Sequence, residues 1–289
     1  MRRLIIYIFW VSTLLAYGED PTIRVATWNM HNFPSGMINL RKPEVETGNI
    51  VKAAEIIKSI NPDVLLLQEI RDEETCQQLT NALKPETYFV LTCSGFKDKG
   101  IVTFQQIAIL SKKKALVSGC DKWKTYGLID PPRGFSYAII QFEDTTLAFY
   151  SIHLKSNLIR GTNKERQIQL NILKRELAIN QLIDHANKLM EANPFDVTSV
   201  IVGGDFNTNE DDLMFTSENT ISQLTLKGYI NCFWGISKDK RTTHPGNNGY
   251  PDTTFDYIFY LNANLAGSPQ IINSSISDHL PVAIELIPE

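Results

Sequence analysis

Beyond its N-terminus, the sequence lacks long hydrophobic runs. After residue 18, no segment approaches the roughly 18 to 20 apolar residues that a membrane-spanning helix needs. The sequence also lacks a linker rich in proline, serine or glycine, an internal repeat and a low-complexity tract. These absences argue against a second membrane-spanning segment and against several domains. We expect one globular domain over residues 19–289.

A surplus of positive charge is also missing, since the formal net charge is −4 at pH 7. This balance argues against a broad electrostatic grip on nucleic acid or on an anionic membrane, and it leaves room for a local basic groove. The four cysteines have no paired metal-ligand spacing, which argues against a zinc site. In an exported protein they allow three disulfide connectivities. Strand-like segments precede Cys93 and Cys120, so we favour a bridge between these two.

The N-terminus has the features of a secretory signal peptide. Two arginines precede an apolar stretch from Leu4 to Leu15, and Ala16-Tyr17-Gly18 follows it. We expect cleavage after Gly18, so that residues 1–18 are lost, the chain becomes more acidic, and the protein is secreted or periplasmic. An uncleaved anchor is the alternative. After cleavage we expect a monomer without a stable membrane anchor.

Hydrophobic periodicity predicts both helices and strands. Helical spacing covers residues 50–60, 73–83 and 163–190, and Thr162 with Glu165 fits a capping box at the start of the third helix. A loop is expected over residues 29–48. Strands are expected over 22–28, 63–68, 88–92, 105–111, 115–117, 136–142, 146–153, 200–202, 229–234, 254–260 and 278–286. Their mostly antiparallel order predicts two packed sheets covered by helices.

Asp205 and Asn207 follow the apolar run Val200–Val202 and a glycine pair. On an extended backbone, residues two apart project to the same side. A carboxylate beside an amide suits the positioning of a water molecule against a phosphorus centre. A helix N-cap or an Asx turn is the alternative, because Asp and Asn favour both.

Six segments share this arrangement, in which an apolar run ends in, or opens from, a polar residue of a catalytic type. In chain order they contain Asn29, Glu69, His153, Asp205 with Asn207, Asp256, and Asp278 with His279. The ordered set resembles the endonuclease/exonuclease/phosphatase superfamily, and in particular its deoxyribonuclease I-like branch. The segments that carry the resemblance are Thr27-Trp28-Asn29, Leu67-Gln68-Glu69, Ile152-His153-Leu154-Lys155-Ser156, Gly204-Asp205-Phe206-Asn207, Phe255-Asp256-Tyr257-Ile258 and Ser277-Asp278-His279.

The resemblance implies an α/β (α+β) fold, a four-layer αββα sandwich of two mainly antiparallel sheets flanked by helices. It also implies that Glu69 binds a divalent metal, with Asn29 and Asp278 completing or supporting the ligand shell. An oxygen-rich site of this kind suits Mg²⁺, with Mn²⁺ or Ca²⁺ as alternatives.

The resemblance assigns the remaining residues to the phosphate and its attacking water. Asp205 orients or deprotonates the water, Asn207 holds the phosphate or the water, and His279, held by Asp256, contacts the phosphate or carries a proton. His153 matches a histidine that protonates the leaving oxygen, although Cys93-Ser94 stand where that branch has a glutamate partner. Arg133 and Ser156 match positions near the substrate phosphate. His31, His185 and His244 are expected to be non-catalytic, with His31 and His244 at the rim.

These residues favour an exported, metal-dependent phosphodiester hydrolase acting on nucleic acid, with DNA favoured. The polar loop over residues 235–252, which contains Lys238, Lys240 and Arg241, leans toward a polyanionic substrate. A sphingomyelinase-like or inositol-phosphate hydrolase is the alternative, because the same groups serve any phosphoester. A non-catalytic binding module on this scaffold is the third reading.

Overall fold

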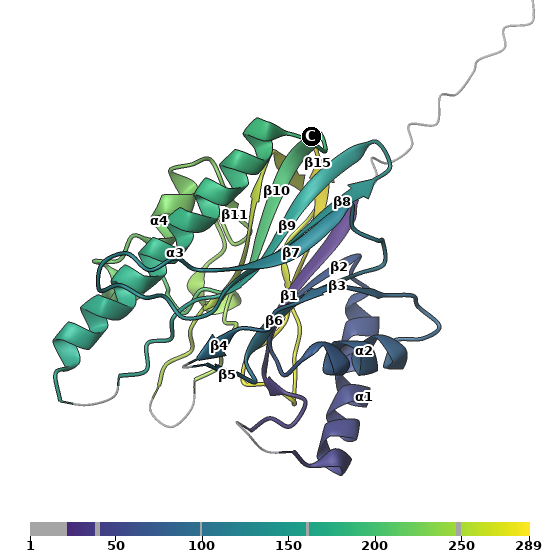
Figure 1. Cartoon of the computed structure of the whole chain (residues 1–289), viewed down its shortest axis with the longest axis horizontal. Coiled ribbons are helices and arrows are strands. Elements are labelled where there is room, and N and C mark those ends of the chain that lie inside the picture. The colour runs from purple at the N-terminus through teal and green to yellow at the C-terminus, as the bar shows by residue number, and fades with distance from the viewer. Residues whose placement is uncertain (1–21, 38–40, 99, 160–161, 247–249) are drawn as a thin grey trace, which may run out of the picture.

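Two stacked β-sheets with helices on both outer faces form the molecule (Figure 1). The structure is a computed structural model, and it describes residues 22–37, 41–98, 100–159, 162–246 and 250–289. The expected signal peptide lies outside these residues. No helix in the described part of the chain is long and apolar enough to cross a membrane. The predicted αββα sandwich is confirmed.

The first sheet has seven strands in the order β13-β15-β1-β2-β6-β3, with β14 beside β15. Only β1 and β2 run parallel. The strands are β1 (Ile23–Phe33), β2 (Val64–Ile70), β3 (Phe89–Cys93), β6 (Gln106–Ser111), β13 (Ala263–Leu265), β14 (Gln270–Ile271) and β15 (Val282–Pro288).

The second sheet has six strands in the order β11-β12-β10-β9-β8-β7, and only β9 and β10 run parallel. A separate two-stranded hairpin, β4–β5, precedes β6. The strands are β4 (Lys97–Asp98), β5 (Ile101–Val102), β7 (Val117–Lys122), β8 (Gly134–Phe142), β9 (Thr145–His153), β10 (Val197–Asp205), β11 (Ile230–Asn231) and β12 (Asp256–Leu261).

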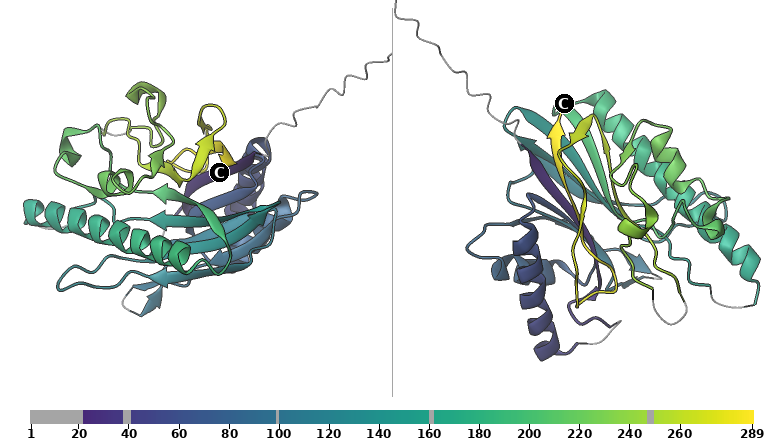
Figure 2. Two further views of the ribbon diagram at one scale, coloured as in Figure 1. Left: turned by 90° about the horizontal axis from the view of Figure 1, so that it is seen from above. Right: turned by 180° about the vertical axis from the view of Figure 1, so that it is seen from behind.

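The helices cover opposite outer faces of the sandwich (Figure 2). Two of them, α1 (Pro43–Ile60) and α2 (Glu73–Ala82), share a buried cluster with the outer face of the first sheet. On the other side lie α3 (Lys164–Ala192) and α4 (Thr220–Thr225), with the short 3₁₀ helices η1 (Leu213–Phe215) and η2 (Lys238–Lys240) in the loops.

Strand alternation divides the core into two parts. In β1, Val25 belongs to the cluster between the sheets, whereas Ala26 and Trp28 belong to the cluster under α1 and α2. This follows from the two-residue period of a strand, which points successive side chains to opposite faces. Residues 25, 27 and 29 therefore share the inter-sheet face, and the functional side chains lie where this face reaches solvent.

Several predicted boundaries were wrong. The first helix begins at Pro43 and not near residue 50, because Glu44 and Glu46 in its first turn extend it ahead of the apolar pattern. The third helix is capped by Asn163, whose side chain accepts a hydrogen bond from the Arg166 backbone, so the predicted Thr162–Glu165 capping box is incorrect.

The last strand begins at Val282 and not at Asp278. The predicted Cys93–Cys120 bridge is also not formed, since all four cysteines are free. The Cys93 thiol instead donates to the Ser94 carbonyl oxygen at 3.8 Å.

Candidate active site

Three polar residues stand side by side where the second sheet ends. Asp205, the last residue of β10, pairs with His153 of β9 on one side and with Asp256 of β12 on the other. Each residue ends or begins its strand, so the sequence pattern of an apolar run closed by a polar residue becomes one row across three strands. The register of the sheet thus brings together residues that are up to 103 positions apart, as the pairing of His153, Asp205 and Asp256 requires.

Gly203 and Gly204 let β10 lie close to β2 of the first sheet and to β9 of its own sheet. A Cβ atom on Gly203 would lie 2.6 Å from a methyl group of Leu66 in the facing sheet. A Cβ atom on Gly204 would lie 2.0 Å from the Ile152 carbonyl oxygen. Backbone cannot give way at position 204, so glycine is required there, whereas at position 203 the Leu66 side chain would have to shift.

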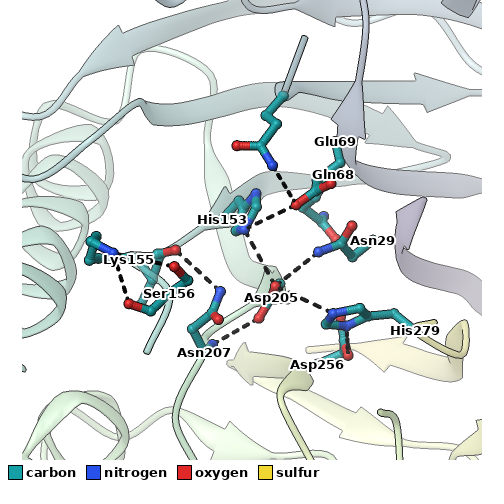
Figure 3. Close-up of polar contacts among 12 residues, drawn as sticks. Asn29, Gln68, Glu69, His153, Lys155, Ser156, Asp205, Asn207, Asp256 and His279 are labelled. Atoms are coloured by element: carbon teal, nitrogen blue, oxygen red, sulfur yellow. Dashed lines mark hydrogen bonds and ion pairs between the residues drawn. The ribbon is translucent and has the colours of Figure 1, made fainter. Parts of the chain in front are cut away.

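The Asp205 carboxylate is fixed from two directions (Figure 3). Asn29 donates its side-chain amide to Oδ2 at 2.9 Å, and the Asn207 backbone donates to Oδ1 at 2.8 Å. Burial raises the pKa of Asp205 to about 6, against the opposing charge of His279. This carboxyl group can therefore accept and release a proton near neutral pH.

Asn207 does not continue the strand as predicted. Its φ of 53° is left-handed, and its backbone N–H closes an Asx turn on Asp205. The Asn207 side chain donates to the Leu154 carbonyl oxygen at 3.3 Å, and the Asn157 side chain donates to the Asn207 carbonyl oxygen at 2.6 Å. The Asx turn that was the alternative for this motif is therefore present, and it also orients the Asp205 carboxylate.

His279 and Asp256 form a buried pair beside Asp205. Nδ1 of His279 lies 2.8 Å from Asp256 Oδ2, which also accepts a hydrogen bond from Thr243. Burial alone would lower the pKa of His279, but the charges of Asp256 and Asp205 outweigh it and raise the pKa to about 10. Its Nε2 lies 3.9 Å from Asp205 Oδ2, so a cationic ring faces the carboxylate.

His153 lies between the carboxylates of the two sheets (Figure 3). Its Nε2 is 3.4 Å from Asp205 Oδ2 and 3.8 Å from Glu69 Oε1. Burial, followed by the charge of Arg133, lowers its pKa well below the ordinary value, so the ring is neutral at pH 7. Its Nδ1 is buried without a hydrogen-bond partner among the described residues, and Ser94 bonds Gln106 instead. His153 thus lacks the carboxylate partner that the deoxyribonuclease-like arrangement has.

Glu69 comes from the first sheet through an irregular backbone. Regular alternation would place it with Leu65 and Leu67 on the helix-facing side, but the register between β2 and its neighbours shifts here and Glu69 has a φ of 58°. The Asn32 backbone donates to Oε2 at 2.8 Å, and Gln105 donates to Oε1 at 2.9 Å. These bonds hold the re-aimed carboxylate in the site.

The expected metal ligands are partly assembled. Glu69 retains lone pairs on both oxygens, and Asn29, whose nitrogen is bonded to Asp205, presents Oδ1, which accepts one hydrogen bond from the His31 backbone. These oxygen donors suit a hard divalent cation. Asp278, however, is turned toward two histidines: its Oδ1 is 2.9 Å from His31 Nδ1 and its Oδ2 is 3.9 Å from His244 Nε2.

Arg133 and Ser156 lie near the row, and both are held by hydrogen bonds within the chain. The Arg133 guanidinium donates to the His153 and Leu154 carbonyl oxygens at 3.0 and 2.7 Å, so it clamps the end of β9. Its charge also acts on Glu69 and Asp205. Ser156 is bonded by Lys155, whose Nζ donates to its carbonyl and hydroxyl oxygens.

Arg175 and Gln105 are functional neighbours that the sequence-based prediction missed. Arg175 of α3 is almost fully buried, forms a bidentate ion pair with Glu218, and donates to the Lys155 carbonyl oxygen at 2.9 Å. Its position on the apolar face, between Ile172 and Ile179, was a usable signal. Gln105 carried no such signal, because its contact with Glu69 is non-local.

The prediction that Arg241 favours a polyanionic substrate, together with Lys238 and Lys240, was wrong. It is buried and pairs with Asp211 and Glu210. Lys238 and Lys240 remain exposed in η2.

The chain matches the family model of the Endonuclease/Exonuclease/phosphatase family over residues 26–279, and it therefore belongs to this family. Members of the family are typically metal-dependent hydrolases of phosphoester bonds. No curated protein sequence matches the chain.

Solved structures similar in fold include a family protein from Leptotrichia buccalis C-1013-b, with a TM-score of 0.60, 18% identity, and coverage of 91% of this chain and 99% of that one. A family protein from Beutenbergia cavernae DSM 12333 has a TM-score of 0.66 and 16% identity, covering 92% and 72%. TDP2 from C. elegans has a TM-score of 0.63 and 15% identity, covering 92% and 75%. At these identities the similarity shows the fold.

Proposed function

We propose that the chain is an exported, Mg²⁺-dependent phosphodiester hydrolase that acts on nucleic acid, with DNA favoured. The observation that carries the proposal is the buried Asp205 carboxylate, fixed by Asn29 and the Asn207 backbone and lying 3.4 and 3.9 Å from the imidazoles of His153 and His279. A carboxylate with a pKa of about 6 between two imidazoles suits the activation of a water molecule.

Each remaining group then has a role. The His279 cation, held by Asp256, binds the charged oxygens of the phosphate, and the neutral His153 ring donates a hydrogen bond from Nε2. Glu69 and Asn29 would hold the divalent cation, which supplies charge neutralisation and polarisation of the phosphoryl group. Asp205 and Asp256 are buried, so bulk water screens their interactions with the two imidazoles only weakly.

Nucleic acid is favoured by the presence of both histidines together with the Arg133 clamp, and by the exposed lysines of η2. A plasmid-nicking assay with and without a chelator tests the proposal. We expect Mg²⁺-dependent nicking that Asp205→Ala abolishes and that Glu191→Gln, a change at an exposed acid in the last turn of α3, leaves intact. Nicking that persists in the chelator, or in Asp205→Ala, would overturn it.

A phosphodiester carried by an amphiphile, as in sphingomyelinases, is the second candidate. The segments that follow or precede the site residues expose large apolar side chains, namely Ile101 of the β4–β5 hairpin, Leu158 after His153, and Leu213 after Asn207, which is 88% exposed. Exposed apolar groups around a polar site suit contact with a lipid surface. Release of phosphocholine from sphingomyelin vesicles, without plasmid nicking, would reverse the order of the two candidates; an inositol-phosphate substrate belongs in the same panel.

A further inference from the structure

A buried polar contact joins the two sheets directly beneath the site. Ser151 of β9 accepts a hydrogen bond from the Gln68 side chain at 3.0 Å, and its hydroxyl donates to the Leu67 carbonyl oxygen at 3.2 Å. Leu67 and Gln68 belong to β2, so one serine of the second sheet is bonded twice to the first sheet. Ser151 and Gln68 are both fully buried. This pair of side chains forms an inter-sheet tie.

The inter-sheet tie lies one layer below the functional groups of both sheets. On β9, Ser151 is two residues before His153, so the two side chains project from the same face about 7 Å apart along the strand. On β2, Gln68 directly precedes Glu69 and lies beside it (Figure 3). The tie is therefore adjacent to Glu69 on one sheet and to the polar row on the other.

Small residues bring the sheets close together at this level. Gly203 of β10 pairs with Ser151 and is two residues before Asp205. A Cβ atom on Gly203 would lie 2.6 Å from a methyl group of Leu66 in the facing sheet. A glycine and a serine thus stand side by side where the first sheet approaches. The hydrogen bonds of Ser151 fix this spacing, because a hydrogen bond weakens outside a narrow range of length and angle.

Gln68 is also held on its own sheet. Its amide nitrogen lies within hydrogen-bonding distance of the Thr27 hydroxyl, at 3.2 Å, and of the Leu66 carbonyl oxygen, at 3.0 Å. Thr27 lies on β1 two residues before Asn29, so the contact reaches both strands that carry the oxygen donors of the first sheet. A change at Ser151 leaves the Gln68 amide with these two partners. It therefore removes the tie without leaving a buried amide unpaired.

We propose that Ser151 and Gln68 are positioning residues, which set the distance between the Glu69 carboxylate and the polar row of the second sheet. The inference rests on the proposed function, in which the cation held by Glu69 and the row act on one phosphate. A misplacement of about 1 Å can cost roughly 10²-fold in rate. Each sheet keeps its own groups when the tie is broken, so the loss falls on their alignment and not on metal binding.

Cleavage kinetics of a labelled DNA duplex by Ser151→Ala at saturating Mg²⁺ test the tie. We expect kcat to fall by roughly 10- to 100-fold, because the metal and the row are no longer aligned. We expect KM, and the Mg²⁺ affinity measured by calorimetry, to stay within about twofold of the parent values. The double variant Ser151→Ala/Gln68→Met should be no slower than Gln68→Met alone, because the two side chains make one contact. Losses that add up would contradict a shared role.

Ser199→Ala is the matched control. Ser199 is also a fully buried serine of the second sheet, and its hydroxyl donates to the Asn262 carbonyl oxygen at 2.6 Å, at the end of β10 away from the site. This variant should lose stability in urea to a similar extent and keep the parent kcat. Equal losses of kcat in Ser151→Ala and Ser199→Ala would show a structural role only and overturn the proposal.

A second measurement does not depend on hydrolysis. Mn²⁺ bound by Glu69 speeds the nuclear relaxation of the His153 ring protons, and this effect falls steeply with the distance between the ion and the ring. We expect slower relaxation in Ser151→Ala than in the parent chain and in Ser199→Ala, because the sheets are no longer held together beneath the site. Unchanged relaxation in Ser151→Ala would overturn the tie even if hydrolysis is intact.

The two proposals fail in different ways. Absence of DNA cleavage by a parent chain that binds Mn²⁺ would contradict the proposed function, and the relaxation of His153 would still decide whether the tie sets the distance. A parent chain that binds no Mn²⁺ would overturn both, since Glu69 would then hold no cation.

Discussion

The two sheets hold their functional side chains in different ways. On the second sheet, His153, Asp205 and Asp256 are in register on three neighbouring strands, and regular strand geometry points them into the site. On the first sheet, Glu69 reaches the site only through left-handed backbone, with a φ of 58°. Such conformations cost roughly 1–3 kcal/mol each and persist where the surroundings enforce them.

This difference teaches that, in the proposed function, the groups that handle protons and the Glu69 carboxylate that would hold the cation are positioned by different backbone geometry. Groups that exchange protons need fixed distances between them. Paired strands fix these distances without a strained backbone conformation. The carboxylate of Glu69 is instead held by hydrogen bonds from Asn32 and Gln105 after a bulge re-aims it. Changes on the two sheets should therefore have distinguishable consequences.

Loss of His279 should have the largest effect. His279→Ala removes the cation with a pKa of about 10 that faces Asp205, and we expect the hydrolysis rate at pH 7 to fall by roughly 10²- to 10⁴-fold. Mg²⁺ affinity, measured by calorimetry, should stay nearly unchanged, because His279 is not among the oxygen donors. A loss of Mg²⁺ binding with little loss of rate at saturating Mg²⁺ would contradict the separation.

Arg175 of α3 holds the segment after β9 by a hydrogen bond to the Lys155 carbonyl oxygen, so its loss should lower the free energy of unfolding. Arg175→Ala leaves Glu218 buried and unpaired, and we expect the free energy of unfolding in urea to fall by about 3–5 kcal/mol. Lys112→Ala, which breaks a partly exposed pair with Asp63, is the control and should cost about 0–1 kcal/mol. Equal costs for the two variants would show that the Arg175 pair is not needed to hold α3 in place.

Glu69→Gln tests the first-sheet side. The neutral amide is a weaker ligand for a hard cation, and we expect Mg²⁺ affinity to fall by roughly 10- to 100-fold in calorimetry. The hydrolysis rate should recover as Mg²⁺ is raised, because the second-sheet row is intact. An unchanged Mg²⁺ affinity would remove Glu69 from the ligand set.

The pH profile should have one limb from Asp205 and one from His279, which are both buried. Asp205 accepts a proton only when ionised, so the rate should rise about tenfold per pH unit up to about 6, its pKa in the metal-free chain; a bound cation moves this limb to lower pH. His279 loses its charge as the pH passes about 10, so the rate should fall there. An acid limb that is unchanged in the residual activity of Asp205→Asn would show that Asp205 is not the acceptor.

Much of the second-sheet side was predictable from the sequence. Strands β9 and β10 end at His153 and Asp205, and β12 begins at Asp256, so the row needed only the strand boundaries and their pairing. On the first sheet, the sequence indicated which residues belong to the site, but not the backbone conformation that directs Glu69 into it. Strict alternation would have turned Glu69 away from the site, and nothing local in the sequence marks Gln105 or the left-handed turn at His31.

Charged residues were the main source of error. Arg241 appeared available for a polyanion, yet it is buried against Asp211 and Glu210, because a loop residue's burial depends on distant packing. Arg175 could have been found, since a charged residue on an apolar helix face requires a buried partner. His31 and His244 were expected at the rim, but their shared contact with Asp278 joins three separate segments.

The most direct test of the central claim is a Mg²⁺ titration of DNA cleavage by the parent chain, Glu69→Gln and Asp205→Asn. We predict cleavage by the parent chain only with the metal present, recovery of Glu69→Gln at raised Mg²⁺, and a loss of roughly 10²- to 10⁴-fold in Asp205→Asn at every concentration. Cleavage by Asp205→Asn at the parent rate, or by the parent chain in chelator, would contradict a metal-dependent hydrolysis centred on Asp205.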